Sequence, residues 1–378
     1  MLKMDSLKNN ISQIVTILKK DLVFSIAFGL SIITSFLSTP KIEYIDFKVL
    51  FTLFNLMLIV SAFKHMKVLD KLAVTLLIKY DSFKKISFIL IYLTFFSSML
   101  ITNDVALITF VPLALIISKR ASISPMKLVI FQTLAANIGS GLTPMGNPQN
   151  LFIFSYYRLT GFEFIKIMLP FTLLGIVWLF ILNNFEKNKK LKFDLDTIII
   201  ESKVKVIVFC LLFIFIILSV FNIINYKIAF IITLLVVLIL NKNLLLKVDY
   251  ILLLTFVCFF IFIGNLSNLP FIKLFARSFL QNKTTTYFSS IILSQVVSNV
   301  PCSILIANFT SNWRELLLGV NIGGLGTLVA SLASVISYKL YIKKRTSNAQ
   351  SRYLTQFTLY NLISLLVFTF VLYFIFIF

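Results

Sequence analysis

Acidic residues, histidine and cysteine are scarce in this sequence of 378 residues, which has 14 acidic residues, one histidine and three cysteines. Catalysis inside a membrane usually needs a histidine, a pair of carboxylates or a lysine beside a nucleophile, and the apolar segments offer no such group. The cysteines have neither the spacing of a disulfide framework nor that of a metal site. No glycine-rich loop is followed by Lys-Ser or Lys-Thr, so we expect no ATP hydrolysis. We therefore expect neither an enzyme nor a bound cofactor.

Apolar residues, in contrast, make up 59% of the chain, which includes 41 phenylalanines and has a mean hydropathy of +0.99. A soluble domain of this composition would aggregate, so we expect a multi-pass protein of the plasma (cell inner) membrane, in contact with the lipid bilayer. The net charge is +21, but Lys and Arg occur in short clusters between apolar runs, which argues against nucleic-acid binding. Lysines precede the first apolar run and no small-residue cleavage site follows it, so we expect an anchor and not a cleaved signal peptide.

The lengths of the apolar runs predict how often the chain crosses the membrane. A helix rises about 1.5 Å per residue, so roughly 20 apolar residues span the hydrocarbon core. Two runs do not fit a plain crossing, because residues 86–118 would form a helix about 50 Å long and residues 287–309 are interrupted in the middle. The interruptions read Thr102-Asn103-Asp104 and Ser298-Asn299-Val300-Pro301, and we predict a re-entrant helical hairpin at each. The ordinary crossings are Leu22 to Pro40, Phe47 to Phe63, Phe164 to Phe185, Val204 to Phe221, Ile224 to Leu240, Tyr250 to Gly264 and Tyr353 to Phe378.

Glycine and asparagine interrupt two more apolar segments, at Asn137 to Asn150 and at Asn321 to Thr327. Unpaired backbone groups in hydrocarbon cost several kcal/mol each, so such breaks are expected only where they line a cavity. Paired breaks in corresponding positions point to the binding site of a secondary transporter. We predict one all-α membrane domain over residues 1–378 with two inverted repeats, 47–185 and 204–378, whose broken helices span 126–157 and 313–341.

The distribution of Lys and Arg tests this layout, because short cytoplasmic loops concentrate positive charge. With the amino terminus inside, the basic segments on both sides of residues 86–118 lie in the cytoplasm only if this stretch enters and leaves the membrane on the same side. The prediction is about nine crossings plus two hairpins of opposite orientation, with the carboxyl terminus outside. The basic segments that then lie in the cytoplasm are Lys64 to Lys85, Lys119 to Lys127, Lys187 to Lys205, Asn241 to Lys247 and Lys339 to Arg352.

Four stretches carry a family resemblance: Ile101 to Pro112, Ala135 to Asn150, Ser294 to Pro301 and Gly319 to Thr327. They resemble the signatures of the ion transporter superfamily, in particular citrate-transporter-like permeases and arsenite or sodium/proton carriers. The resemblance implies two inverted repeats, each with a re-entrant hairpin and a broken helix, in a homodimer that works by an elevator-like motion. In the divalent-anion/sodium symporters of this group both hairpin tips read Ser-Asn-Thr, contact substrate carboxylates and flank sodium sites. Here the threonine at the third position of this motif is absent from both tips, and the first tip has a carboxylate, Asp104, in its place. This difference argues against a dicarboxylate substrate.

The tips and breaks have a chemistry that suits transport. An interrupted helix leaves unpaired N–H groups, which attract anions, and unpaired carbonyl groups, which coordinate cations. An asparagine side chain can serve both. We expect the glycines to adopt positive φ values that turn carbonyl groups inward, and to allow close approach. The predicted substrate-binding residues are Thr102, Asn103, Asn147, Ser298, Asn299 and Thr327. The predicted cation-binding residues are Asn103, Asp104, Asn137, Gly139, Thr143, Gly146, Asn299, Asn321, Gly323 and Gly326.

Simpler interpretations stay open for the same residues. Asn103 and Asp104 are residue types that also cap a helix, here the half-helix that begins at Val105. Clustered glycines also serve close helix packing without any ligand.

Asp104 is the only carboxylate inside a predicted hairpin, and an ionisable group there is functional by default. It would bind sodium, accept a proton, or exclude multivalent anions unless a cation neutralises it, and a proton and sodium would compete for it. We predict a secondary active transporter that moves a small organic or inorganic anion, coupled to a sodium or proton gradient. The alternatives are a sodium/proton antiporter, with Asp104 as the exchange group, and an anion channel built from the same polar hairpins.

Overall fold

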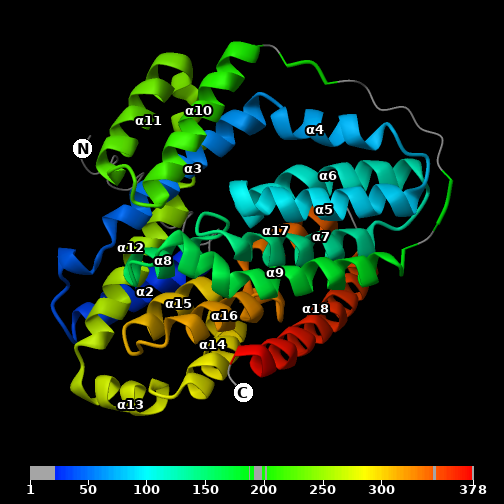
Figure 1. The fold of residues 1–378 in the computed structure, drawn as a ribbon. Helices are drawn as coiled ribbons and strands as arrows, with labels where there is room; N and C mark the ends of the chain where they lie inside the picture. Colours follow the sequence, from blue (N-terminus) through cyan, green and yellow to red (C-terminus); the bar gives the residue numbers. More distant parts are fainter. Residues whose placement is uncertain (1–21, 187, 191–197, 201, 344–345, 377–378) are drawn as a thin grey trace, which may run out of the picture.

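The chain folds into helices that are joined by short loops (Figure 1). The computed structural model describes residues 22–186, 188–190, 198–200, 202–343 and 346–376, and no β-strand occurs among them. The α-helices are α2 (Leu22–Ser35), α3 (Phe47–His65), α4 (Val68–Leu77), α5 (Phe83–Ile101), α6 (Asn103–Arg120), α7 (Met126–Gly139), α8 (Pro148–Tyr156), α9 (Gly161–Asn183), α10 (Lys203–Val220), α11 (Tyr226–Asn241), α12 (Tyr250–Ser267), α13 (Pro270–Leu280), α14 (Lys283–Val297), α15 (Asn299–Ala307), α16 (Trp313–Gly323), α17 (Leu332–Ile342) and α18 (Ser347–Phe376). The 3₁₀ helices are η1 (Ile42–Tyr44), η2 (Ser140–Leu142), η3 (Lys242–Lys247) and η4 (Leu328–Ala330).

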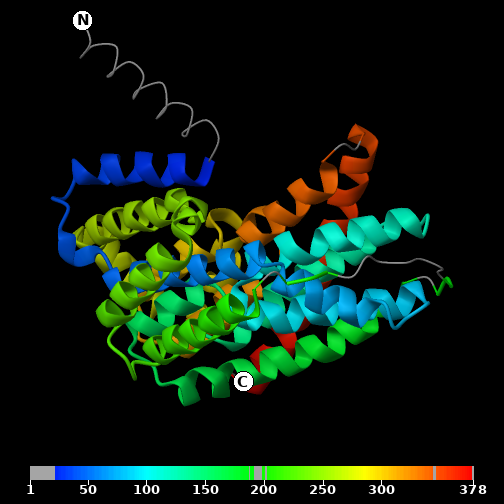
Figure 2. The same cartoon turned by 90° about the horizontal axis from the view of Figure 1, so that it is seen from above.

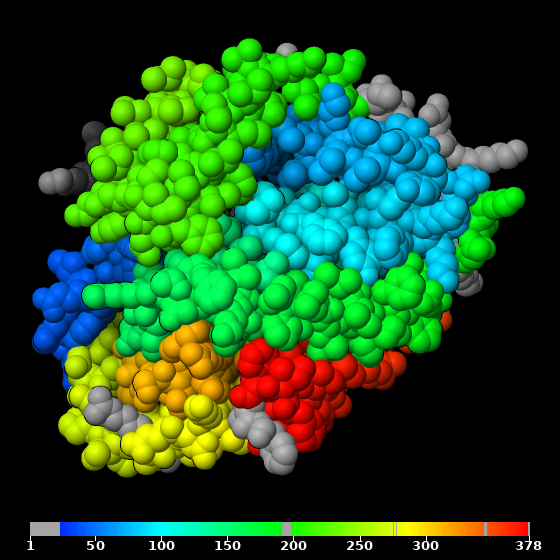
Figure 3. All heavy atoms as spheres, viewed as in Figure 1, coloured from blue at the N-terminus to red at the C-terminus, as the bar shows by residue number. Residues whose placement is uncertain are grey.

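Seven of the described helices are long and apolar enough to cross a membrane, namely α3, α5, α9, α10, α11 together with η3, α12 and α18. Two shorter helices, α2 and α17, are also apolar. Large apolar side chains are exposed along α9, α10, α11 and α18, which form much of the face in Figure 3. So much apolar surface is stable only against lipid, and the chain is therefore an integral multi-pass membrane protein.

Two pairs of consecutive helices are separated by a single residue. α5 ends at Ile101 and α6 begins at Asn103, so Thr102 is the tip of the first helix pair. α14 ends at Val297 and α15 begins at Asn299, so Ser298 is the tip of the second helix pair. The two helices of each pair pack against one another, as α5 and α6 show in Figure 1.

Two further stretches of helix are broken. α7 ends at Gly139 and the chain resumes as α8 at Pro148, which leaves the first break at residues 140–147. α16 ends at Gly323 and α17 begins at Leu332, which leaves the second break at residues 324–331. The sequence explains the restart at α8, because the Asn147 side chain accepts a hydrogen bond from the backbone N–H of Asn150 at 2.9 Å. Proline is also well suited to a first helical position, where its missing N–H has no partner to lose.

The helix pairs and the broken helices pack together at the centre of the molecule. α6 contacts α17 and α15 contacts α8, so each pair packs against a broken helix from the other half of the chain. α9 and α18 cover α7 and α16, while α3 contacts α8, α10, α11 and α12 on another side. Seen from above, α2 lies at one edge beside α12 (Figure 2). The central helices are thereby shielded from lipid, and nearly all of α7 and α16 is buried.

Gly139 lets α7 pack closely on α5. A Cβ atom at this position would overlap the backbone carbonyl of Phe95 and the side chain of Ser98. Gly139→Ala should therefore lower the free energy of unfolding by about 1–3 kcal/mol, the usual cost of overpacking, and lower the melting temperature in detergent. Gly29→Ala on α2 is the control, because nothing lies within 4 Å of a Cβ atom there. Equal melting temperatures for the two variants would contradict this close approach.

Candidate functional site

The two tips share one unusual backbone conformation. Thr102 has φ 73° and ψ 149°, and Ser298 has φ 72° and ψ 153°. Glycine is almost the only residue that occupies this region, and others there cost about 1–3 kcal/mol unless their surroundings hold them. Strained residues cluster at ligand sites, so the matching strain makes both tips candidate site elements.

The first tip is bound to the first break through Asn103. The backbone N–H of Asn103 donates to the carbonyl of Gly146 at 3.1 Å, and its side-chain amide donates to Oδ1 of Asn137 at 3.3 Å. Its own Oδ1 accepts from the backbone N–H of Asp104 at 3.0 Å. Asn103 therefore has one contact in the first turn of α6 and two contacts to the broken helix, which is more than a helix cap requires.

The second tip presents an asparagine without a partner. The hydroxyl of Ser298 donates to the carbonyl of Ala330 at 3.3 Å and so joins this tip to the second break. The neighbouring Asn299 is 4% exposed, yet its side chain has no hydrogen bond to any described residue. A Cβ atom on Gly324 would lie 2.9 Å from Nδ2 of Asn299, so this amide faces bare backbone. Buried amides nearly always have partners, and a bound ligand would supply the missing one.

Each tip region is held by the same threonine contact. The hydroxyl of Thr143 donates to the carbonyl of Met99, and the hydroxyl of Thr327 donates to the carbonyl of Gln295 at 3.0 Å. Each accepting carbonyl belongs to the last turn of the helix that leads to the tip. The two predicted threonines therefore connect the breaks to the helix pairs.

Contacts between the two halves also occur in matching pairs. Asn137 and Asn321, which occupy corresponding places before the two breaks, are the centres of these contacts. Asn137 is bonded to Ser331 at 3.0 Å and Asn321 to Asn147 at 3.2 Å. A second pair joins Asn137 to Ser334 at 3.3 Å and Asn321 to Asn150 at 2.7 Å. The breaks that the sequence places far apart are thus brought together in one buried polar network.

The prediction of positive φ values at the glycines is wrong, because none of the 11 glycines has one. The glycines instead allow close packing: Gly139 faces α5, Gly323 faces Ser294 of α14, and Gly326 faces the carboxamide of Gln295. Gly146 takes part through its carbonyl, which accepts from Asn103. The packing interpretation of the glycine clusters is therefore the one that the structure supports.

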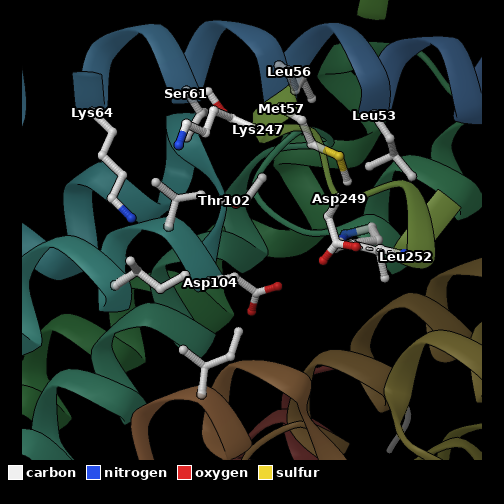
Figure 4. A pocket seen from close by; sticks show the side chains of 15 residues that line it. Leu53, Leu56, Met57, Ser61, Lys64, Thr102, Asp104, Lys247, Asp249 and Leu252 are labelled. Carbon is white, nitrogen blue, oxygen red and sulfur yellow. Dashed lines mark hydrogen bonds between the residues drawn. The ribbon is translucent and has the colours of Figure 1, made fainter. Parts of the chain in front are cut away.

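A cavity of about 280 Å³ lies beside the first tip. Its wall is formed by α3, by the first tip and the first two turns of α6, by Pro148 at the start of α8, by residues around the start of α12, and by Ile336 of α17. In Figure 4 the carboxylates of Asp104 and Asp249 both face this space. Lys64 and Lys247 also line it, so the cavity can balance a ligand charge of either sign.

The predicted site residues are divided between this cavity and the network behind it. Thr102 and Asp104 line the cavity, whereas Asn103, Asn137, Asn147 and Asn321 belong to the buried network. Ser298 and Asn299 lie at the second tip and are not part of the cavity wall. Within the described residues no group of three or more His, Cys, Asp and Glu side chains could hold a metal ion.

Lys64, Lys247 and Asp249 line the cavity but were not among the predicted site residues. Lys64 is in the last turn of α3, Lys247 ends η3, and Asp249 caps α12 by accepting from the backbone N–H of Leu252 at 2.9 Å. In the sequence these residues are ordinary charges at helix ends. Their position in segments that flank apolar runs was the only signal available.

Known proteins with similar sequences give a consistent picture. A protein-family model described as Citrate transporter matches residues 11–312. An uncharacterized transporter of Methanocaldococcus jannaschii is 40% identical over 299 residues, which are 78% of this chain and 81% of the relative. The inner membrane protein YbiR of Escherichia coli is 29% identical over 86% of this chain and 88% of its own length. A shorter match, 32% identical over 21% of this chain and 14% of the relative, is to a protein of Dictyostelium discoideum named as the transporter arsB.

Proposed function

Because the chain belongs to the citrate transporter family, we propose that it is a secondary active transporter of a small organic or inorganic anion, coupled to a sodium or proton gradient. Its relatives and its apolar helices already make it a membrane transporter. The observation that carries the finer proposal is the cavity, where Asp104 lies beside the starts of α6 and α8. Helix starts attract anions, and a carboxylate attracts cations.

The charges of the cavity supply a basis for coupling. Asp104 and Asp249 would repel an anion unless a cation or a proton neutralises them. The cation therefore raises the affinity for the anion, and by linkage the anion raises the affinity for the cation by the same factor. Lys64 and Lys247 attract the anion into the same space.

The architecture that we propose has two inverted repeats, residues 47–185 and 204–378, in which the helix pairs are re-entrant hairpins. The matching tip conformations and the matching hydrogen bonds around Asn137 and Asn321 support this correspondence. α15 has nine residues, which at about 1.5 Å each is far too short to cross a bilayer. About nine crossings then accompany the two hairpins. Assembly as a homodimer is part of the proposal.

The proposed topology predicts toward which side of the membrane the cavity opens. Lys64 ends α3 and Lys247 ends η3, and both lie in basic segments that the distribution of Lys and Arg assigns to the cytoplasm. The cavity would then open toward the cytoplasm, and the conformation would be the inward-facing one.

A sodium/proton antiporter is the second candidate function. The observation that favours it is the pair of carboxylates, Asp104 and Asp249, that face one cavity. An exchanger needs a carboxylate that binds sodium and protons in turn, and no anion would be required.

Purified protein in proteoliposomes distinguishes the two candidates. Citrate, succinate, sulfate and arsenite would be tested for uptake under an imposed sodium or proton gradient, while the internal pH is recorded. Uptake of one anion that depends on the gradient would support the proposal and identify the substrate. A pH change driven by sodium alone, with no anion present, would instead favour the antiporter.

Asn299→Ala should reduce the initial rate of anion uptake by roughly 10- to 100-fold, which corresponds to one lost hydrogen bond to a charged ligand. The melting temperature should stay unchanged, because the Asn299 side chain has no hydrogen bond to lose within the described residues. Asn308→Ala is the matched control, since Asn308 caps the same helix and its amide donates only to the carbonyl of Ile304. Undiminished uptake in Asn299→Ala would remove this residue from the site.

A further inference from the structure

Asn150 fills the first break with its side-chain amide. The side chain is fully buried, and its Nδ2 lies 3.2 Å from the carbonyl oxygen of Ser140, 3.1 Å from that of Gly141 and 3.3 Å from that of Thr143. An amide nitrogen carries two hydrogens, so the three carbonyl groups share them. The nitrogen therefore occupies the place on which these carbonyl groups converge.

Gln295 lies at the start of the second break and comes from a different element. Its Nε2 donates to the carbonyl of Gly323, the last residue of α16, at 2.6 Å and to that of Ile291, in its own helix α14, at 3.1 Å. Its Oε1 accepts from the backbone N–H of Thr327 at 2.8 Å. The absence of a side chain at Gly326 is what makes room, because a Cβ atom there would overlap the Gln295 carboxamide.

These two carboxamides are not copies of one inherited contact. Asn150 comes from α8 and its counterpart in the other half is Ser334, since both are bonded to the asparagine of the opposite half. Gln295 comes from α14 and its counterpart is Met99, since both offer a carbonyl to a break threonine. Each half thus places a side-chain carboxamide at its break with a residue that the other half lacks.

Other carbonyl groups of the breaks also have donors. The carbonyl of Gly324 accepts from Asn137 at 3.2 Å, that of Gly146 from Asn103, and that of Ala330 from Ser298. Unwound carbonyl groups are the usual ligands of a coupling cation in a broken helix. A carboxamide offers the same carbonyl groups partial positive charge without bringing a net charge into the protein interior.

We propose that Asn150 and Gln295 are specificity-determining residues, whose carboxamides take the places of metal cations and so keep sodium out of both helix breaks. Because the proposal rests on the proposed function, it assigns the coupling cation to Asp104 at the cavity. The glycines that were predicted as cation ligands, such as Gly139, and the one threonine, Thr143, then have structural roles only.

Sodium binding to purified protein tests this proposal without any anion. Radioactive sodium binding at equilibrium, and the melting temperature in sodium chloride against choline chloride, would be measured for Asp104→Asn alone and combined with Gln295→Ala. The single variant should bind no sodium above background. The combined variant should gain saturable binding, with an apparent sodium affinity at least roughly tenfold higher than that of the single variant. Asn150→Ser, which introduces the residue found in the other half, provides a second route if Gln295→Ala does not fold.

Asn361→Ala in the same Asp104→Asn background is the matched control. Asn361 is fully buried and its amide donates to the carbonyl of Phe357 within α18, away from both breaks. Sodium binding that persists in Asp104→Asn alone would overturn the proposal, since the carboxamides are then intact. Folded Gln295→Ala and Asn150→Ser variants that gain nothing over the control would overturn it as well. A failure of the proposed function would be seen elsewhere, as wild-type protein that takes up no anion under any gradient.

Discussion

Asp104→Asn should reduce gradient-driven anion uptake by roughly 100-fold or more, about 2.7 kcal/mol, while the amount of folded protein in the membrane stays the same. Asp104 faces the cavity from the first turn of α6, and its carboxylate has no hydrogen-bond donor among the described residues. Asparagine keeps the size of the side chain, but it has no negative charge to attract a cation and cannot take up a proton. The loss should therefore fall on coupling and not on folding.

The measurement is the initial uptake rate in proteoliposomes under a sodium gradient and, separately, under a proton gradient. Asp70→Asn is the control, because this carboxylate on α4 is not part of the cavity wall. If a proton is the coupling ion, the remaining uptake of Asp104→Asn should lose its dependence on pH. Wild-type rates in Asp104→Asn under both gradients would rule out this residue as the coupling group.

Asn137→Ala should lower the free energy of unfolding by at least about 3 kcal/mol. Asn137 is 5% exposed and takes part in four side-chain hydrogen bonds, accepting from Asn103 and Ser331 and donating to the Gly324 carbonyl and to Ser334. Its removal leaves several of these buried groups without a partner, and each costs about 1–3 kcal/mol.

The comparison variant for Asn137→Ala is Asn55→Ala on α3. Asn55 is 2% exposed, and its side-chain oxygen has no partner, so little should be lost there. Melting temperatures in detergent, followed by the fluorescence of Trp178 and Trp313, would report both variants. A similar, small shift for the two would mean that the network around Asn137 contributes little to stability.

The positions of the helix interruptions could be predicted from the sequence. α5, α7, α14 and α16 end at Ile101, Gly139, Val297 and Gly323, in or next to stretches marked by glycine, asparagine and proline. These residues act locally, through caps, turns and missing side chains, so their effect is visible without a structure. The sequence did not predict two helices that contain charged residues. α4 (Val68–Leu77) and α13 (Pro270–Leu280) lie in segments that read as charged connections.

The partners of the site residues could not be predicted, because they are set by tertiary packing. Gln295 looks like an isolated polar residue in an apolar helix, and only the fold brings its carboxamide to Gly323 and Thr327. Asp249 similarly lies far along the chain from Asp104, yet both face one cavity. Positive φ values were expected at the glycines of the breaks, but within the tips and breaks they occur at Thr102 and Ser298, where contacts with the breaks hold the strained backbone.

The hydrogen bonds between the two breaks restrict the motions by which the proposed transporter could open its site first to one side of the membrane and then to the other. Parting the two halves would break the hydrogen bonds of Asn321 to Asn147 and Asn150. It would also break those of Asn137 to Gly324, Ser331 and Ser334, all in a buried region. We expect the central helices to travel instead as one rigid unit past α3 and α12, leaving Lys64 and Asp249 at the stationary wall. A covalent cross-link between α3 and α6 would then arrest the cycle without blocking any ligand.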